Sequence, residues 1–191
     1  MLIKQHSFKG RRLGEGTLFK IYPDWKNEVA EDEVIVGDMN EVAVQRVADR
    51  AIGRNKPGLP EDERNFRREW DKLYKNKSTR AEAIAQLNSY LATNDVKTLV
   101  HRNPLPDVVS PRVLRIKEIR VGLGDVAIPN SKILYNIMQG DNDGDHISLE
   151  FLPDELVLAL EKAINSKAFK ARQKAIKLDI FKKDDFKGSM E

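Results

Sequence analysis

Apolar residues change their spacing several times along the chain, and each change predicts a different kind of element. Near the N-terminus, short β-rich runs punctuated by glycines predict strands, most clearly at Thr17–Tyr22 and Glu33–Gly37. The spacing then becomes helical until residue 94. Strand patterns return after Asp95, and from Pro153 onward the pattern is helical again. The chain therefore reads as strands, a helical stretch, more strands and a terminal helix.

Three helices are predicted in the helical stretch, each with one apolar face. These faces comprise Val44, Val47, Ala48 and Ala51 in the first helix, Phe66, Trp70, Leu73 and Tyr74 in the second, and Ala81, Ile84, Leu87 and Leu91 in the third. We expect the first helix to end near Gly53. The third should begin at Thr79, whose side chain would form a capping box with Glu82.

Short strand patterns, broken by prolines and glycines, fill the region after Asp95. They span Val96–His101, Val113–Val121, Val126–Ile128, Ile133–Met138 and Ile147–Phe151, and Leu156, Leu160, Ala163 and Ile164 then mark the last helix. Strands as short and as often interrupted as these favour a barrel over a doubly wound sheet.

One α+β domain accounts for this order of elements, because 191 residues suffice for a single core. We expect the first barrel strands in residues 1–38, a helical insert in 39–94, the remaining strands with an acidic loop in 95–152, and a C-terminal helix and tail in 153–191. No internal repeat of fixed period is visible.

Composition narrows the class of protein without identifying it. The net charge of +3 and the pI of about 9.0 are compatible with nucleic-acid binding but do not demonstrate it. Cysteine is absent, which excludes disulfides and thiolate metal sites. No signal peptide and no apolar run near the ~20 residues of a membrane helix are visible. We therefore expect no membrane association and a location in the cytoplasm of a bacterial host cell or in a virion.

The strongest chemical signal is an acidic segment, Gln139–Asp145. Asp141, Asp143 and Asp145 stand at i, i+2 and i+4, and Gly144 lets the backbone tighten between the last two. Three carboxylates this close repel one another unless a positive charge lies among them, and no Lys or Arg occurs within the segment. Carboxylate oxygens are the hard ligands that Mg²⁺ prefers. A bound Mg²⁺ is therefore the favoured explanation.

Four interpretations of the acidic segment compete. It is a solvated hairpin turn, an EF-hand-like calcium loop, a structural metal site without chemistry, or a nucleotidyl-transfer site. The EF-hand register places the three Asp residues and Glu150 at ligand positions. It also places Gln139 where an Asp belongs, His146 where a buried aliphatic residue belongs, and strands where helices belong.

Two short blocks resemble the two-barrel RNA polymerases, and most closely the largest, β′-like subunit of the multisubunit DNA-dependent enzymes. The metal-binding motif of that family is Asn-Ala-Asp-Phe-Asp-Gly-Asp, and here Gln139–Asp145 keeps all three acids and the glycine. An upstream family block, Asn-Arg-x-Pro, resembles His101-Arg102-Asn103-Pro104. The likeness covers most of residues 7–165 loosely and is close only in these two blocks.

The resemblance implies a double-psi β-barrel in which Asp141, Asp143 and Asp145 hold the catalytic Mg²⁺ and Arg102 reaches the sugar of the incoming nucleoside triphosphate. It also implies a DNA template, an RNA product and partner subunits, because this chain is too short to contain the second barrel. A divided bacteriophage subunit and a fragment of a longer chain explain the length equally well. Where the family often has a His shortly after the motif, this chain has Glu150. The rival hypothesis is a non-catalytic metal-stabilised or nucleic-acid-binding barrel.

Overall fold

The computed structural model describes residues 17–54, 58–103, 111–136, 145–167 and 170, and within them the fold is α+β. These residues form a mixed sheet of six strands together with five helices. In chain order the elements are β1 Thr17–Ile21, β2 Glu33–Gly37, α2 Glu41–Ala51, α3 Glu61–Lys75, α4 Arg80–Leu91, β3 Lys97–Asn103, β4 Arg112–Arg120, β5 Val126–Pro129, α5 Ser131–Asn136, β6 His146–Glu150 and α6 Asp154–Asn165.

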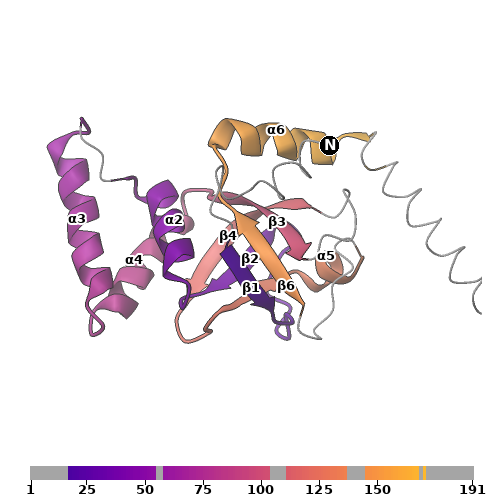
Figure 1. The fold of residues 1–191 in the computed structure, drawn as a ribbon, viewed down its shortest axis with the longest axis horizontal. Helices are drawn as coiled ribbons and strands as arrows, with labels where there is room; N and C mark the ends of the chain where they lie inside the picture. The colour runs from indigo at the N-terminus through magenta and orange to yellow at the C-terminus, as the bar shows by residue number, and fades with distance from the viewer. Residues whose placement is uncertain (1–16, 55–57, 104–110, 137–144, 168–169, 171–191) are drawn as a thin grey trace, which may run out of the picture.

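The sheet closes on itself in the order β1-β5-β2-β4-β3-β6, because each strand has two hydrogen-bonded neighbours. Only the pairs β1–β5 and β2–β4 are parallel, and the other four pairs are antiparallel. Alternate residues of the strands supply a common buried core, for example Phe19, Ile116 and Ile147. Figure 1 shows the strands crossing at the centre, with α2, α3 and α4 on one side and α6 on another.

A close backbone approach lies where β2 leaves the sheet toward α2. A Cβ atom on Gly37 would lie 2.0 Å from the carbonyl oxygen of Gly124, a separation that no real side chain tolerates. The amide of Met39 donates to the same carbonyl at 3.3 Å. Gly37 is therefore required by the packing of this corner against the turn that precedes β5.

The helical insert contains its own buried contacts and is tied to the sheet. Trp70 stacks on Tyr74 and donates from its indole nitrogen to the carbonyl of Ala83 at 2.8 Å. Asn88 on α4 both donates to the carbonyl of Ile119 and accepts from its amide, each at 2.8 Å. These two bonds fix α4 against β4, so the insert is held to the sheet.

The structure confirms most of the helical prediction and corrects some details. Thr79 is the N-cap of α4, but its hydroxyl donates to the carbonyl of Leu73 at 2.7 Å, so the predicted capping box is wrong. Ala81 is exposed and Ala83 takes its place in the core, because α4 is rotated slightly from the expected face. In α6, Ala163 is exposed and Val157 is buried instead. Phe66 of α3 was predicted on the apolar face but is 43% exposed.

The predicted strand Ile133–Met138 is wrong where the structure describes it. Residues 131–136 form the helix α5, and 137–138 lie outside the described residues. Asn130 caps the helix: its side-chain oxygen accepts from the amide of Ile133 at 3.2 Å. Ile133 and Leu134 are both buried, and an adjacent apolar pair suits a strand or a helix equally. The start signal at Pro129–Asn130 decides between them.

A second apolar layer covers the outside of the sheet under α6. Leu99 of β3 packs with Leu152 and Val157, and Lys97 forms an ion pair with Glu161 at 2.9 Å. Figure 1 shows α6 lying across the end of the strands. Within the residues that the structure describes, none of the helices is long and apolar enough to span a membrane.

Candidate functional site

The two sequence blocks singled out above meet on neighbouring strands. β3 carries Arg102 near its end and runs antiparallel to β6, with Arg102 opposite Ile147 and Asn103 opposite His146. Asp145 directly precedes the first residue of β6. The two residues are 43 positions apart in sequence and are neighbours only because β3 and β6 pair.

Arg102 and Asp145 form an ion pair at this position. The Nη2 atom of Arg102 lies 3.0 Å from Oδ2 and 3.2 Å from Oδ1 of Asp145. Both side chains are mostly buried, with 22% and 17% of their surfaces exposed. The main chain of Asp145 is also held, because its carbonyl accepts from the amide of Ile21 at 3.1 Å. Asp145 is thus fixed by both its side chain and its backbone.

The ion pair changes the electrostatic argument made from the sequence. No cation occurs within the acidic segment itself, but β3 brings a guanidinium to one of the three acids. Asp141 and Asp143, together with Gln139 and Gly144, lie outside the described residues. In the described part of the chain there is no cluster of three or more His, Asp or Glu residues that could hold a metal.

Asp145 has the chemistry that a Mg²⁺ ligand requires. A carboxylate has two oxygens with about four lone-pair sites, so a carboxylate bound to a guanidinium can in general also bind a cation. Its oxygens are hard donors, held at a partly buried position where charge is less screened than at the surface. Asp145 therefore fits the expected role of one metal ligand.

A second polar contact between the same two strands, His101 with Glu150, was missed by the sequence reasoning. Nε2 of His101 lies 2.8 Å from Oε1 of Glu150, and both side chains are nearly buried. Strand alternation places this pair on the opposite face of the sheet from Arg102. Glu150 therefore belongs to strand β6 and bonds across to β3. That placement contradicts the EF-hand interpretation, in which the twelfth loop residue ligates calcium as a helix begins.

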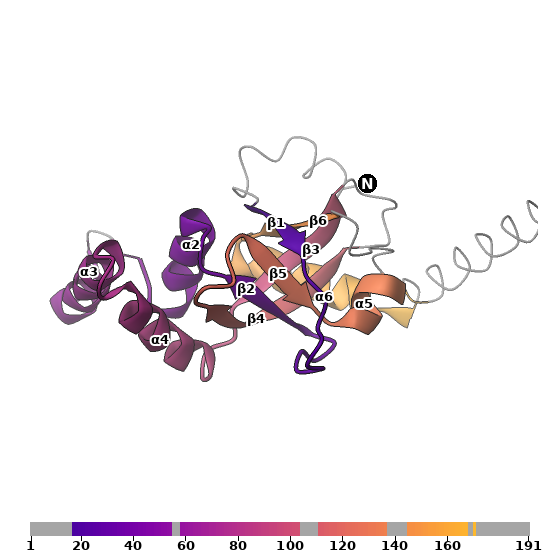
Figure 2. The same ribbon diagram turned by 90° about the horizontal axis from the view of Figure 1, so that it is seen from below.

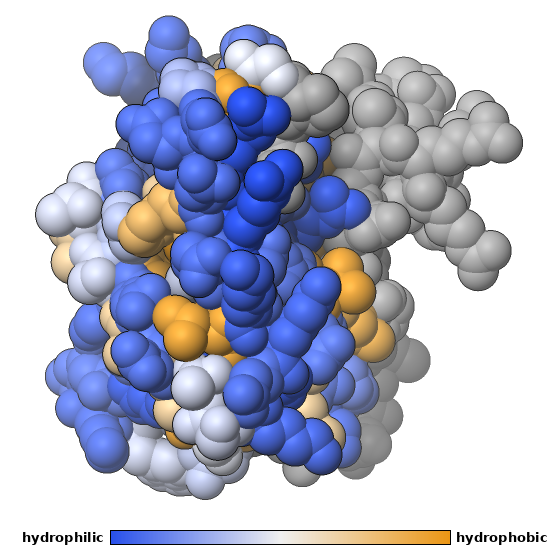
Figure 3. Space-filling view, turned by 90° about the vertical axis from the view of Figure 1, so that its left-hand side faces the viewer, coloured by the Kyte–Doolittle hydropathy of each residue, from blue (hydrophilic) through white to orange (hydrophobic). Residues whose placement is uncertain are grey.

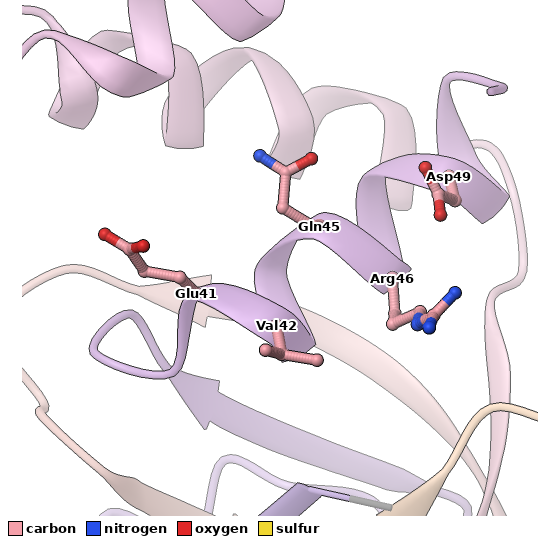
Figure 4. Close-up of a pocket in the computed structure, with 5 residues that line it drawn as sticks. All are labelled: Glu41, Val42, Gln45, Arg46 and Asp49. Carbon is pink, nitrogen blue, oxygen red and sulfur yellow. The ribbon is translucent and has the colours of Figure 1, made fainter. Parts of the chain in front are cut away.

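A hollow of about 380 Å³ lies elsewhere, along α2. Figure 4 shows its lining residues, all of them from this one helix: Glu41, Val42, Gln45, Arg46 and Asp49. Gln45 and Asp49 are already bonded to Arg67, and Glu41 pairs with Arg80 at 3.3 Å. Polar groups committed to the insert's own ion pairs do not converge on a ligand, so we do not regard this hollow as a reactive site.

The surface of the helical insert that faces away from the sheet also lacks the features of a binding site. Figure 3 shows it as mostly hydrophilic, with small and separate hydrophobic spots. Obligate protein interfaces present larger continuous apolar areas.

Comparison with known proteins does not identify the function: no protein-family profile matches the chain, and no curated protein matches it. The end of the β3–β6 ladder is therefore the strongest candidate site among the described residues.

Proposed function

We propose that this chain is the Mg²⁺-binding catalytic barrel of a DNA-dependent RNA polymerase, corresponding to its β′-like subunit. The observation that carries the proposal is the Arg102–Asp145 ion pair. The resemblance rests on two separate sequence blocks. If both likenesses were due to chance, there would be no reason for residues of the two blocks to be in contact in the structure. Their contact on adjacent strands is what a shared active site requires.

Strand order supports the finer proposal that the sheet is a double-psi β-barrel. Exchanging β1 with β4, β2 with β5 and β3 with β6 leaves the set of neighbouring strands in the ring β1-β5-β2-β4-β3-β6 unchanged. The same exchange turns the parallel pair β1–β5 into the parallel pair β2–β4. The helices after β2 and β5 match as well, because Asn40 and Asn130 each accept a bond from the amide three residues on. Two interlocked copies of one strand-strand-helix-strand unit would produce this symmetry.

The proposed reaction is attack of the RNA 3′-hydroxyl on the α-phosphate of a nucleoside triphosphate, with release of pyrophosphate. Asp141, Asp143 and Asp145 would hold Mg²⁺, whose contribution is to activate the hydroxyl and to stabilise charge on the leaving group. The protein's own contribution is positioning and a fixed electrostatic environment. The bonds from Ile21 and Arg102 to Asp145 serve that purpose.

Arg102 has two tasks in this proposal. It holds Asp145 in place, and it contacts the sugar of the incoming nucleotide. A guanidinium has five N–H donors in a planar fork, so binding one carboxylate through Nη2 is compatible with a second contact. The remaining machinery, including the second barrel, would come from partner chains that also bind the DNA template and the RNA product.

The ion pair also favours one rival, a barrel that kept the fold without the chemistry. Arg102 compensates the charge of Asp145 without any metal, so a stable structure does not by itself demand a cation there. Co-purification decides between the two. A catalytic barrel should bring with it a chain carrying the second barrel and its lysines, whereas a stand-alone module should not.

Asp143→Ala in the assembled complex tests the catalytic assignment. Loss of a metal ligand should reduce RNA synthesis by roughly 10³-fold or more. Asp62→Ala is the matched control, because Asp62 is an exposed acid in the first turn of α3. If the intact complex carrying the Asp143 variant kept more than about a tenth of the wild-type rate of RNA synthesis, the catalytic assignment would be wrong.

A further inference from the structure

The segment between β1 and β2 displays two aromatic rings to solvent. Tyr22 is 47% exposed and Trp25 is 78% exposed. Tryptophan is highly buried on average, so a side chain exposed to this extent invites a functional explanation. The other tryptophan of the chain, Trp70, is almost completely buried in the insert.

The backbone that carries these rings is held by specific bonds. Both carboxylate oxygens of Asp24 accept from main-chain amides, those of Glu28 at 3.1 Å and Val29 at 3.0 Å. The side chain of Asn130 donates to the carbonyl of Val29 at 2.7 Å. Figure 2 shows the segment running from the end of β1 past α5 before β2 begins. The rings are therefore presented on a preorganised support, which reduces the entropic cost of binding.

This segment begins beside the candidate site. Lys20 lies opposite His146 in the β1–β6 ladder, and the amide of Ile21 donates to the carbonyl of Asp145. Tyr22 is the next residue, and its amide donates to the carbonyl of Ala127 at 3.0 Å. A ligand lying on Tyr22 and Trp25 would thus extend along the surface from the residue that we assign to the metal.

Most acidic side chains between β1 and β2 are bonded to groups other than Lys20 and Lys26. Three of the segment's four acids are engaged: Asp24 with the backbone, Glu28 with Arg120 and Glu31 with Lys132. Glu33, the first residue of β2, pairs with Arg115. Lys20 and Lys26 are exposed and form no ion pair with the residues that the structure describes. Asp32, next to β2, is the remaining exposed acid of the segment. The end nearer Asp145 therefore combines rings with cations.

We infer that Tyr22 and Trp25, flanked by Lys20 and Lys26, form a stacking platform for single-stranded nucleic acid that enters or leaves the Asp145 site. The inference extends the proposed function and rests on it. Bases stack on isolated rings, and lysines attract the phosphates between them. A protein partner would instead favour a continuous apolar patch. Around Trp25, the exposed neighbours Lys26 and Asn27 are polar.

The test uses the full chain without added metal and fluorescein-labelled dT₁₂ and rU₁₂, with fluorescence anisotropy as the readout. Trp25→Ala should weaken binding about tenfold, and Trp25→Phe should retain most of the affinity because a ring remains. Lys26→Ala should reduce the slope of log affinity against log salt by about 0.7. Met39→Ala is the control, since Met39 is 71% exposed but lies at the start of the insert.

Equal affinity of Trp25→Ala and wild type for both oligonucleotides would overturn the inference. The same result is expected if Trp25 binds a protein partner instead of nucleic acid. In the two Trp25 variants, Trp70 is the remaining tryptophan, and fluorescence from its buried ring shows that these variants remain folded. Failure here is distinct from failure of the proposed function. Oligonucleotide binding needs neither metal nor partner subunits, whereas the Asp143→Ala test measures RNA synthesis in the assembled complex.

Discussion

The Arg102–Asp145 ion pair joins the two blocks on which the functional proposal depends, and its strength is open to measurement. The perturbation is a double-mutant cycle of Arg102→Met, Asp145→Asn and the double variant. Methionine keeps much of the length of the arginine stem without its charge, and asparagine keeps the shape of aspartate. The cycle isolates the coupling between the two side chains from the separate effects of each substitution.

The expected magnitude follows from distance and burial. Two unit charges about 4 Å apart interact by about 4 kcal/mol at an effective dielectric constant of about 20. Desolvation offsets much of this gain, and exposed pairs measure only about 0.2–1 kcal/mol. Because these two side chains are about a fifth exposed, at 22% and 17%, the result should lie between those limits. We predict a coupling energy of about 1–2 kcal/mol.

Urea unfolding followed by far-ultraviolet circular dichroism, in the presence of EDTA, supplies the four free energies of unfolding. The exposed pair Lys72–Glu69, at 72% and 68%, is the control and should couple by no more than about 0.5 kcal/mol. A coupling energy for Arg102 and Asp145 below about 0.3 kcal/mol would refute the reasoning, because the two side chains would then not interact in solution.

Three further predictions concern the packing that supports the site. Burial raises the pKa of Tyr74 above its ordinary 10.0, so its contribution to stability is present below pH 10 and is lost as pH rises through the higher folded-state pKa. Tyr74→Phe should remove this alkaline loss in urea titrations. At pH 7 the same substitution should raise the free energy of unfolding by about 0 to 1 kcal/mol, since the Tyr74 hydroxyl has no hydrogen-bond partner within the described residues. Arg67→Met should cost about 3 kcal/mol in thermal or urea unfolding, because buried Arg67 binds Asp49, Asp71 and Gln45; a cost below about 1 kcal/mol would contradict that role. Gly37→Ala should cost at least about 2 kcal/mol by the same assay, and a neutral result would show that the turn at Gly124 moves freely.

Local patterns predicted most of the elements because period and punctuation suffice for them. Glu33–Gly37 was predicted with the bounds that the structure shows, since a short apolar run ends at a glycine. The helix 131–136 is hard to predict from the sequence because Ile133 and Leu134 are adjacent, which suits either period, so the N-cap at Asn130 is the deciding signal.

The site was harder to predict than the elements because its contacts are not local. The sequence reasoning placed a cation requirement at the acidic segment but assigned Arg102 only to the nucleotide. Which strands pair decides that Arg102 meets Asp145 and that His101 meets Glu150. Pairing between distant strands leaves no periodic signal in a single sequence, so neither contact was predictable without the topology.

The central claim is that the acidic segment holds a divalent metal that takes part in RNA synthesis, and metal rescue tests it most directly. The chain has no cysteine, so Asp143→Cys introduces a single thiol. Thiolates are soft ligands that suit Mg²⁺ poorly and transition metals better. We predict that the assembled complex carrying this variant loses RNA synthesis with Mg²⁺ and regains a substantial part of it with Mn²⁺, relative to wild type in the same metals. Undiminished synthesis with Mg²⁺, or an equal loss with both metals, would contradict the account.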